Sequence, residues 1–229
     1  MSQAADSARI GRQLSAWQGM LERLYEVEAG QDINHFLLTD KAFVQLMEGR
    51  AYRESREKVL VQEIDGELNV SVYLDPGLLE RLHRSPPEQS LHVGNLADFW
   101  VALEGVSHFV YLGHNARYDR PVSRLEMELQ AEVDKFVLAN LFLARQQGHT
   151  PGEQLHHALF HRPRFDTRLS HEEGQRYARA SGYAGRYCRR LLSRMRRRAG
   201  GALNRELRRF YRLNRHRKIQ FIEQCAAVT

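Results

Sequence analysis

The hydrophobic positions of this chain recur mainly at helical spacing. Near the N-terminus, apolar side chains three or four residues apart predict one buried face of a helix over residues 7–28. These side chains are Ile10, Leu14, Trp17, Leu21 and Leu24. An amphipathic helix gains most of its stability from tertiary packing, so this stripe is expected to cover a core.

Alternating apolar and polar positions replace this spacing between residues 59 and 74. Two runs rich in Val, Leu and Ile, residues 59–64 and 67–74, flank the dipeptide Asp65-Gly66. Asp-Gly suits the positive φ angles of a two-residue type I′ turn, so the pattern predicts an antiparallel β-hairpin. Because an isolated hairpin is marginally stable in water, we expect it to pack on helices. A third strand is expected from residues 36–38 or 91–93.

Most of the remaining chain predicts helices that begin at capping residues. Asp75 followed by Pro76 begins a short helix, and Asn95 and Ser123 begin two long helices that form a central helical hairpin over residues 99–140. Further helices are expected at residues 150–160, 170–195, 204–213 and 217–224. Together these patterns predict an α+β fold that is predominantly α-helical.

The placement of charge divides the chain into two parts. The 229 residues carry a formal net charge of +6. Residues 161–218 contain 19 Lys and Arg against 4 Asp and Glu, which gives +15 there and leaves −9 for the rest. We therefore predict an acidic α+β body, residues 1–160, and an arginine-rich helical region, residues 161–229, packed on it. The two parts can also form one single domain.

The arginines of the C-terminal helices form the first candidate site. Clustered cations attract nucleic-acid phosphates and release condensed counterions. The candidate contacts are Arg186, Arg189, Arg190, Arg194, Arg196, Arg197, Arg198, Arg205, Arg208, Arg209, Arg212 and Arg215. Exposed aromatic side chains between them would stack on unpaired bases; the candidates are Tyr177, Tyr183, Tyr187, Phe210 and Tyr211. We therefore expect a non-enzymatic, nucleic acid-binding protein, with RNA or a ribonucleoprotein as the favoured partner.

The same cluster has other interpretations. The arginines can be a solvated helix face, can be neutralised by the acidic body, or can recognise an acidic protein or a phospholipid surface. Recognition of an acidic protein would make the chain an adaptor or scaffold. No Asp or Glu lies between Glu173 and Glu206, so charge from outside that stretch must balance it. The apolar stripe is rich in Ala and Gly rather than Leu, Phe or Trp, so no membrane partner is predicted.

Ionisable residues of the central hairpin form the second candidate site. Glu104 and His108 are four residues apart on one helix, and Glu128 and Glu132 are four apart on the next. An antiparallel hairpin would bring these pairs together as a metal- or histidine-dependent catalytic site. Carboxylate-bridged helical bundles, however, carry Glu-x-x-His, whereas this chain has Glu-x-x-x-His. Glu128 and Glu132 also border an apolar stripe, where solvated structural carboxylates are common, so no metal or cofactor is assigned.

Two polar segments are weaker candidates. The loop 114–120 contains hydrogen-bonding and titratable groups, and Arg120 is placed to bind an anion near the N-terminus of the next helix. Glu153, His157 and His161 recur every four residues along one helix face. Three ligand-type side chains in a row differ from a convergent metal site, and both segments are also typical of polar surface.

Several function classes lack their sequence signatures. The chain contains no Walker A motif, no GxGxxG after a strand, no GxSxG elbow and no HExxH motif. Its two cysteines, Cys188 and Cys225, predict neither a disulfide framework nor a zinc site. No apolar run approaches the ~18 residues of a membrane span, and the N-terminus does not resemble a signal peptide. We therefore expect a cytoplasmic protein.

Overall fold

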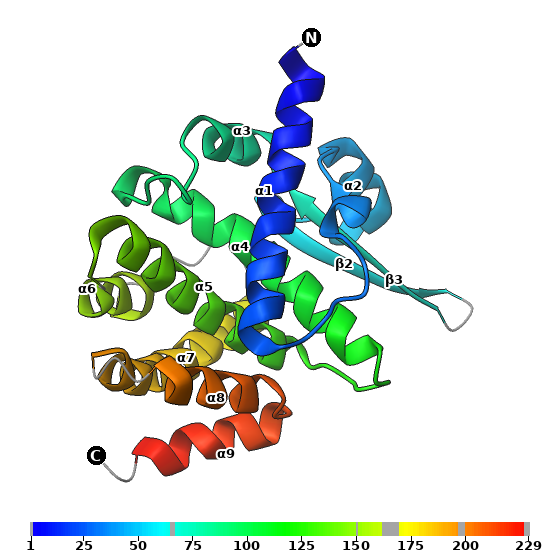
Figure 1. The fold of residues 1–229 in the computed structure, drawn as a ribbon. Helices are drawn as coiled ribbons and strands as arrows, with labels where there is room; N and C mark the ends of the chain where they lie inside the picture. The colour runs from blue at the N-terminus through cyan, green and yellow to red at the C-terminus, as the bar shows by residue number, and fades with distance from the viewer. Residues whose placement is uncertain (1, 65–66, 150, 162–169, 197–199, 227–229) are drawn as a thin grey trace.

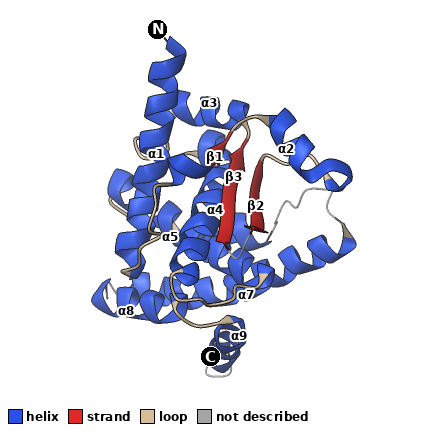
Figure 2. Ribbon diagram, turned by 90° about the vertical axis from the view of Figure 1, so that its right-hand side faces the viewer, coloured by secondary structure: helices blue, strands red, loops and turns tan. Residues whose placement is uncertain are grey.

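The structure is a computed structural model that describes residues 2–64, 67–149, 151–161, 170–196 and 200–226. The structure consists mainly of helices, with a small sheet at one side (Figures 1 and 2). The helices are α1 (Ser2–Tyr25), α2 (Lys41–Glu48), α3 (Pro76–Arg84), α4 (Val93–Ala116), α5 (Arg124–Gln147), α6 (Gly152–His156), α7 (His171–Arg196), α8 (Gly200–Tyr211) and α9 (Arg215–Ala226). Two 3-10 turns, η1 (Ile33–Phe36) and η2 (Gly49–Ala51), and a π-helical turn, η3 (His157–His161), complete the helical elements. The predicted α+β, predominantly α-helical class is confirmed.

The sheet has three strands in the order β1-β3-β2. Strand β2 (Glu57–Ile64) is antiparallel to β3 (Glu67–Leu74), with Val59 opposite Val72, as the hairpin pattern predicts. The turn between these two strands lies outside the described residues. Strand β1 (Leu37–Leu38) pairs in parallel with β3. The third strand is thus found in the first of the two predicted places.

Capping side chains begin the helices, with two corrections. Asp75 and Ser123 accept hydrogen bonds from backbone N–H groups in the first turns of α3 and α5, as expected. Helix α4 begins earlier than predicted, because His92 is its N-cap and Asn95 is its third residue, whose side chain accepts a hydrogen bond from the backbone N–H of His92. Helix α8 begins at Gly200 rather than after Asn204.

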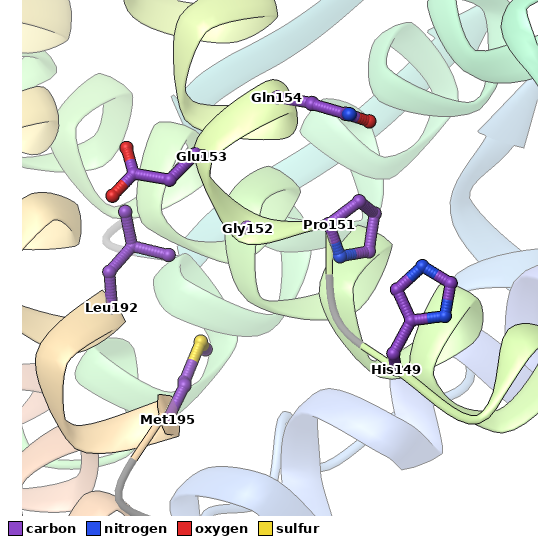
Figure 3. A pocket seen from close by; sticks show the side chains of 7 residues that line it. All are labelled: His149, Pro151, Gly152, Glu153, Gln154, Leu192 and Met195. Carbon is purple, nitrogen blue, oxygen red and sulfur yellow. The ribbon is translucent and has the colours of Figure 1, made fainter.

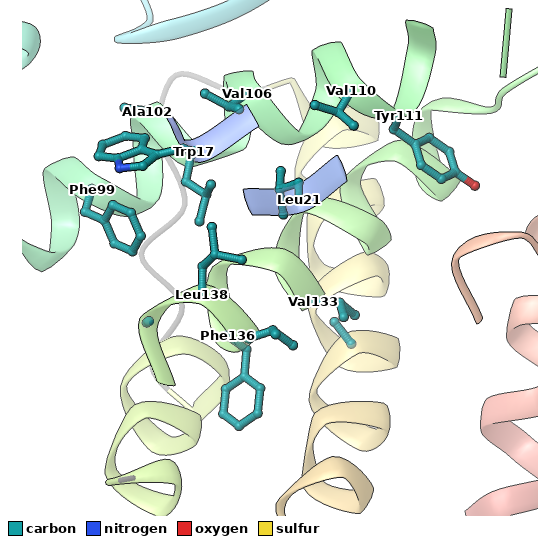
Figure 4. Packing of buried hydrophobic residues seen from close by; sticks show 14 of the residues in the cluster. Trp17, Leu21, Phe99, Ala102, Val106, Val110, Tyr111, Val133, Phe136 and Leu138 are labelled. Atoms are coloured by element: carbon teal, nitrogen blue, oxygen red, sulfur yellow. The ribbon is translucent and has the colours of Figure 1, made fainter. Parts of the chain in front are cut away.

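Helices α4 and α5 form the centre of the molecule. Helix α4 packs against α1, α3 and the strands β2 and β3, while α5 packs against α7. The predicted stripe of α1 is largely buried, and Trp17 and Leu21 lie against Phe99 and Val106 of α4 and Leu138 of α5 (Figure 4). The central hairpin therefore lies between α1, the sheet and α7.

The C-terminal helices share the same hydrophobic core. Helix α7 packs on α5, α8 and α9, and α8 also packs on α1. Their buried apolar stripe is Ala180, Ala184, Cys188, Leu191, Leu207, Phe210 and Ile222. The arginine-rich region therefore packs on the body, while its predicted boundary at residue 161 stays a prediction. Among the described helices, none is long and apolar enough to cross a membrane.

Candidate functional site

Ionisable side chains of β2, α4 and α5 meet in the interior. We call them the carboxylate–histidine cluster, and its members are Glu57, Glu104, His108, Glu128, Glu132 and Lys135. The structure thus brings together the four hairpin residues chosen from the sequence. It adds Glu57, from the start of β2, and Lys135, one turn beyond Glu132 on α5.

A glycine allows β2 to approach α4 at this cluster. A Cβ atom at Gly105 would lie 3.0 Å from Cγ1 of Val72 and 3.3 Å from Cγ of Glu57. A larger residue would therefore crowd the strand, whereas glycine leaves room for the carboxylate beside the helix.

His108 lies between two carboxylates. Its Nδ1 atom is 3.5 Å from Oε1 of Glu57, and its Nε2 atom is 3.5 Å from Oε2 of Glu128. Burial alone would favour the neutral imidazole, but the two carboxylates outweigh it and hold the pKa of His108 well above its usual value. The two carboxylates therefore favour the protonated ring.

Lys135 balances part of the remaining negative charge. Its ammonium group donates hydrogen bonds to Glu104 at 2.5 Å and to Glu132 at 2.8 Å. Burial opposes the charged form, but these carboxylates outweigh it and raise the pKa of Lys135. Burial also raises the pKa values of Glu57 and Glu132, whereas in Glu104 the effect of burial is exceeded by Lys135 and His108, which lower its pKa. Two of the carboxylates are thus held in an environment that disfavours their charge.

The cluster is more deeply buried than the sequence indicates. Glu128 is only 5% exposed, and the side chain of Glu132 is 15% exposed. The expectation that both are solvated is wrong because α7 covers this side of α5. Tyr177 of α7 hydrogen-bonds Glu128, and burial, followed by the nearby carboxylates, raises the pKa of Tyr177.

A second buried polar network joins the body to α9. Asp134 accepts hydrogen bonds from Tyr25, from Ser107 and from Gln130. Lys218 of α9, which is fully buried, donates to Oε1 of Gln130 at 2.7 Å. Burial raises the pKa of Asp134 to about 6 and lowers the pKa of Lys218 to about 7. One cation of the basic region is therefore part of the interior.

Several predicted phosphate contacts already bind groups within the protein. Arg190 and Arg194 both contact the carboxylate of Glu206, at 3.0 Å and 2.8 Å. Arg208 pairs with Glu26 of the body at 2.6 Å. Glu206 belongs to the arginine-rich region itself, whereas Glu26 belongs to the acidic body, so the body neutralises part of the arginine charge, as one of the alternatives from the sequence supposed.

Other predicted contacts remain exposed. Four of them have no carboxylate oxygen within 4.0 Å in the described part of the chain: Arg186, Arg205, Arg209 and Arg215. Arg189 is also exposed, 3.8 Å from Glu153 and hydrogen-bonded to His161. The side chain of Arg196 and residues 197–198 lie outside the described residues.

Arginines from α7 and α8 gather around one ring and one carboxylate. The guanidinium carbons of Arg190 and Arg209 lie 5.5 Å and 5.7 Å from the centroid of the Phe221 ring. Arg194 joins them through the carboxylate of Glu206 that it shares with Arg190, and Arg186 lies one turn before Arg190. We call Arg186, Arg190, Arg194 and Arg209 the arginine face. With only Glu206 among them, the group carries a net charge of +3.

The aromatic side chains between these arginines are mostly not available for stacking. Tyr187, Phe210 and Tyr211 are buried. The rings of Tyr187 and Phe210 stack on each other with centroids 3.9 Å apart, and Tyr211 stacks on Tyr25. The expectation that these three contact bases is therefore wrong, while Tyr177 and Tyr183 are half-buried.

The predicted polar loop lines a basic cleft of about 720 Å³. Arg117 pairs with Glu28 at 2.9 Å, and Arg120 donates to the carbonyl oxygen of Arg212. Arg212 itself donates to main-chain carbonyls at the end of α1. Burial, together with these three arginines, lowers the pKa of His114. The loop thus fixes α8 to the end of α1, and its arginines are largely engaged in that contact.

A smaller cleft of about 210 Å³ lies between the start of α6 and the end of α7 (Figure 3). In Figure 3, Leu192 and Met195 of α7 lie on one side and Pro151 and His149, which precede α6, on the other. His157 and His161 are exposed with stacked rings, and Arg189 hydrogen-bonds His161. Within the described residues, Glu153, His157 and His161 do not offer ligand atoms to a common point.

Comparison with protein-family models, curated proteins and solved structures finds no match for this chain.

Proposed function

We propose that this protein is cytoplasmic and binds nucleic acid through the arginine face. RNA or a ribonucleoprotein is the favoured partner. The observation that carries the proposal is that Arg190 and Arg194 share the one carboxylate of Glu206, while Arg190 and Arg209 both lie beside the Phe221 ring. Arg186 and Arg209 are exposed there with no carboxylate partner in the described part of the chain. A polyanion would supply the missing negative charge.

The contacts suit phosphate rather than bases. A guanidinium has five N–H donors, so Arg194 can contact Glu206 and still offer donors to a phosphate. Burial of Tyr187, Phe210 and Tyr211 prevents these three rings from stacking on bases. We therefore propose binding that depends on the nucleic-acid backbone and that is independent of sequence.

The test is fluorescence anisotropy of nuclease-treated protein with labelled single- and double-stranded RNA and DNA over a series of salt concentrations. The variant Arg186→Gln/Arg209→Gln removes two exposed contacts that have no carboxylate partner. We expect the slope of log affinity against log salt to fall by about 1.4 to 1.8, because each phosphate contact contributes about 0.7 to 0.9. The matched control, Arg12→Gln/Arg50→Gln, removes two exposed arginines elsewhere and should leave the slope unchanged.

Three outcomes contradict the proposal. Wild-type protein that fails to bind any of the four probes at low salt overturns it. Equal slopes for the wild type and the Arg186/Arg209 variant place the contact elsewhere. Binding of labelled heparin without any binding of RNA or DNA would assign the arginine face to an acidic protein, as in an adaptor or scaffold.

Metal- or histidine-dependent catalysis is a second candidate function. The meeting of Glu104, His108, Glu128 and Glu132 in one buried cluster favours it. If the substrate is RNA, wild-type protein should cleave the labelled probe when a divalent ion is present, and His108→Gln should not. Intact RNA after incubation with both proteins would exclude cleavage of that substrate.

A further inference from the structure

We propose that Glu57, Glu104 and His108 form a binding site for one divalent transition-metal ion. One ligand atom from each residue lies within 4.8 Å of the other two, and no other group in the described residues has this arrangement. The ligands come from β2 and α4. A bound ion would therefore fasten the β-hairpin to the central helical hairpin.

Two buried atoms at this point lack hydrogen-bond partners. They are Oε1 of Glu57, which faces Nδ1 of His108 where the ion would bind, and Nε2 of His108, which faces Glu128 on the opposite side of the ring. The side chain of Glu57 is 9% exposed and that of His108 is 3% exposed, so water does not replace the missing partners at a surface. Buried polar atoms are nearly always satisfied in folded proteins, and a bound ion is one established reason for an exception, here for Oε1 of Glu57.

The spacing between the ligand atoms fits a metal better than a hydrogen bond. Nδ1 of His108 and Oε1 of Glu57 are 3.5 Å apart, whereas a hydrogen bond between such atoms is about 2.7 to 3.2 Å long. Around a tetrahedral ion with ligand distances of about 2.0 to 2.2 Å, neighbouring ligand atoms are about 3.3 to 3.6 Å apart. Nδ1 therefore stands at the separation expected of a ligand.

The charge of the cluster also favours a cation. Glu57, Glu104, Glu128 and Glu132 carry four negative charges when ionised, and Lys135 supplies one positive charge. With His108 neutral, as a ligand must be, the buried group has a net charge of −3. A divalent ion removes most of this imbalance in a place where unpaired charge is strongly disfavoured.

Neighbouring groups are placed to orient the ligands. Glu128 faces Nε2 of His108, opposite the Nδ1 atom that would bind the ion, which is the carboxylate–histidine–metal arrangement. Lys135 donates to Oε2 of Glu104 and fixes that carboxylate. One imidazole and two carboxylates suit Zn²⁺, Co²⁺, Mn²⁺ or Fe²⁺, and three protein ligands leave a coordination position open.

The test is Co²⁺ titration of the full chain after dialysis against EDTA, with elemental analysis and the visible absorption of the bound ion as readouts. We expect one Co²⁺ per chain. Glu57→Gln and His108→Gln should each weaken Co²⁺ binding by at least about 100-fold, because each removes a ligand. The control Glu132→Gln removes the same charge from the cluster without removing a ligand, so its affinity should fall by about 10-fold or less.

Two results would overturn the site: wild-type protein that retains no Co²⁺, Zn²⁺ or Mn²⁺, or ligand variants that bind Co²⁺ as tightly as the wild type. If circular dichroism shows that both variants unfold, X-ray absorption of the Zn²⁺-loaded wild type decides. An imidazole nitrogen with oxygen ligands supports the site, and a shell without imidazole excludes it. RNA anisotropy on the same samples separates this result from nucleic-acid binding, since the arginine face shares no residue with the cluster.

Discussion

Replacement of Lys218 with methionine should remove a large part of the pH dependence of stability. The ammonium group of Lys218 is fully buried, lies 4.5 Å from the centroid of the Tyr111 ring and 5.0 Å from that of Phe210, and donates one hydrogen bond to Gln130. Burial lowers its pKa from 10.5 to about 7. Methionine has a similar length and no charge, so it keeps the packing and removes the titration.

The direction of this pH dependence follows from the number of protons that the folded and unfolded states bind. Between pH 7 and 10.5 the unfolded chain keeps the lysine proton while the folded protein releases it, so the free energy of unfolding rises with pH. A full difference of one proton corresponds to about 1.4 kcal/mol per pH unit. With the two pKa values of Lys218, the gain from pH 7.5 to pH 9 is about 2 kcal/mol. The pKa of Asp134, about 6, lies below this window.

Urea unfolding followed by circular dichroism at pH 7.5, 8.25 and 9 gives the required free energies. The quantity to compare is the change with pH in each protein, because a constant offset from the lost hydrogen bond to Gln130 does not affect it. Lys218→Met should show a rise smaller than that of the wild type by about 2 kcal/mol. The control Lys41→Met replaces an exposed lysine and should keep the wild-type slope. If the free energy of unfolding rises equally with pH in Lys218→Met and in the wild type, the claim that burial lowers the pKa of Lys218 is refuted.

Two further substitutions test packing. Gly113→Ala should destabilise the protein by about 1 to 3 kcal/mol in urea unfolding, because its Cβ would lie 2.7 Å from the carbonyl oxygen of Ala29. Gly182→Ala, in an exposed helical position with no atom within 4 Å of the new Cβ, should instead stabilise it by up to about 1 kcal/mol. Burial raises the pKa of the Cys188 thiol, so in a Cys225→Ser background Ellman's reagent should label it only at the rate of unfolding. Rapid labelling of the folded protein would show that α7 is not packed as described.

Local signals in the sequence predict the elements well. The two strands of the hairpin pair in the register that places Val59 opposite Val72, as the Asp65-Gly66 pattern requires. The side chain of Ser123 caps α5, and that of Asp75 caps α3. Such signals involve residues close together in the chain, so their geometry does not depend on the tertiary fold.

The depth of burial was not predictable in the same way. Periodicity identifies the apolar face of a helix, but it does not tell how many neighbours cover its other faces. The pattern of α5 therefore does not indicate that Glu126 hydrogen-bonds Tyr111 and that Asp134 hydrogen-bonds Tyr25 in the interior. Glu57 reaches the cluster because β2 packs against α4, which is distant from it in the sequence. No local sequence signal indicates this contact. Lys135 lies three residues after Glu132 on the same helix, so helical spacing could have predicted that it belongs to the carboxylate–histidine cluster.

The two proposed sites follow from one electrostatic argument applied in two environments. The carboxylate–histidine cluster has an excess of negative charge in the interior, where only a small cation can enter and where the cost of unpaired charge is high. The arginine face has an excess of positive charge at the surface, where solvent screens each group and no single contact is strong. A metal ion should therefore bind the cluster through a few short, geometrically defined bonds. A polyanion should bind the arginine face through several weak contacts, and its affinity should fall as the salt concentration rises. Salt dependence therefore distinguishes polyanion binding from metal binding.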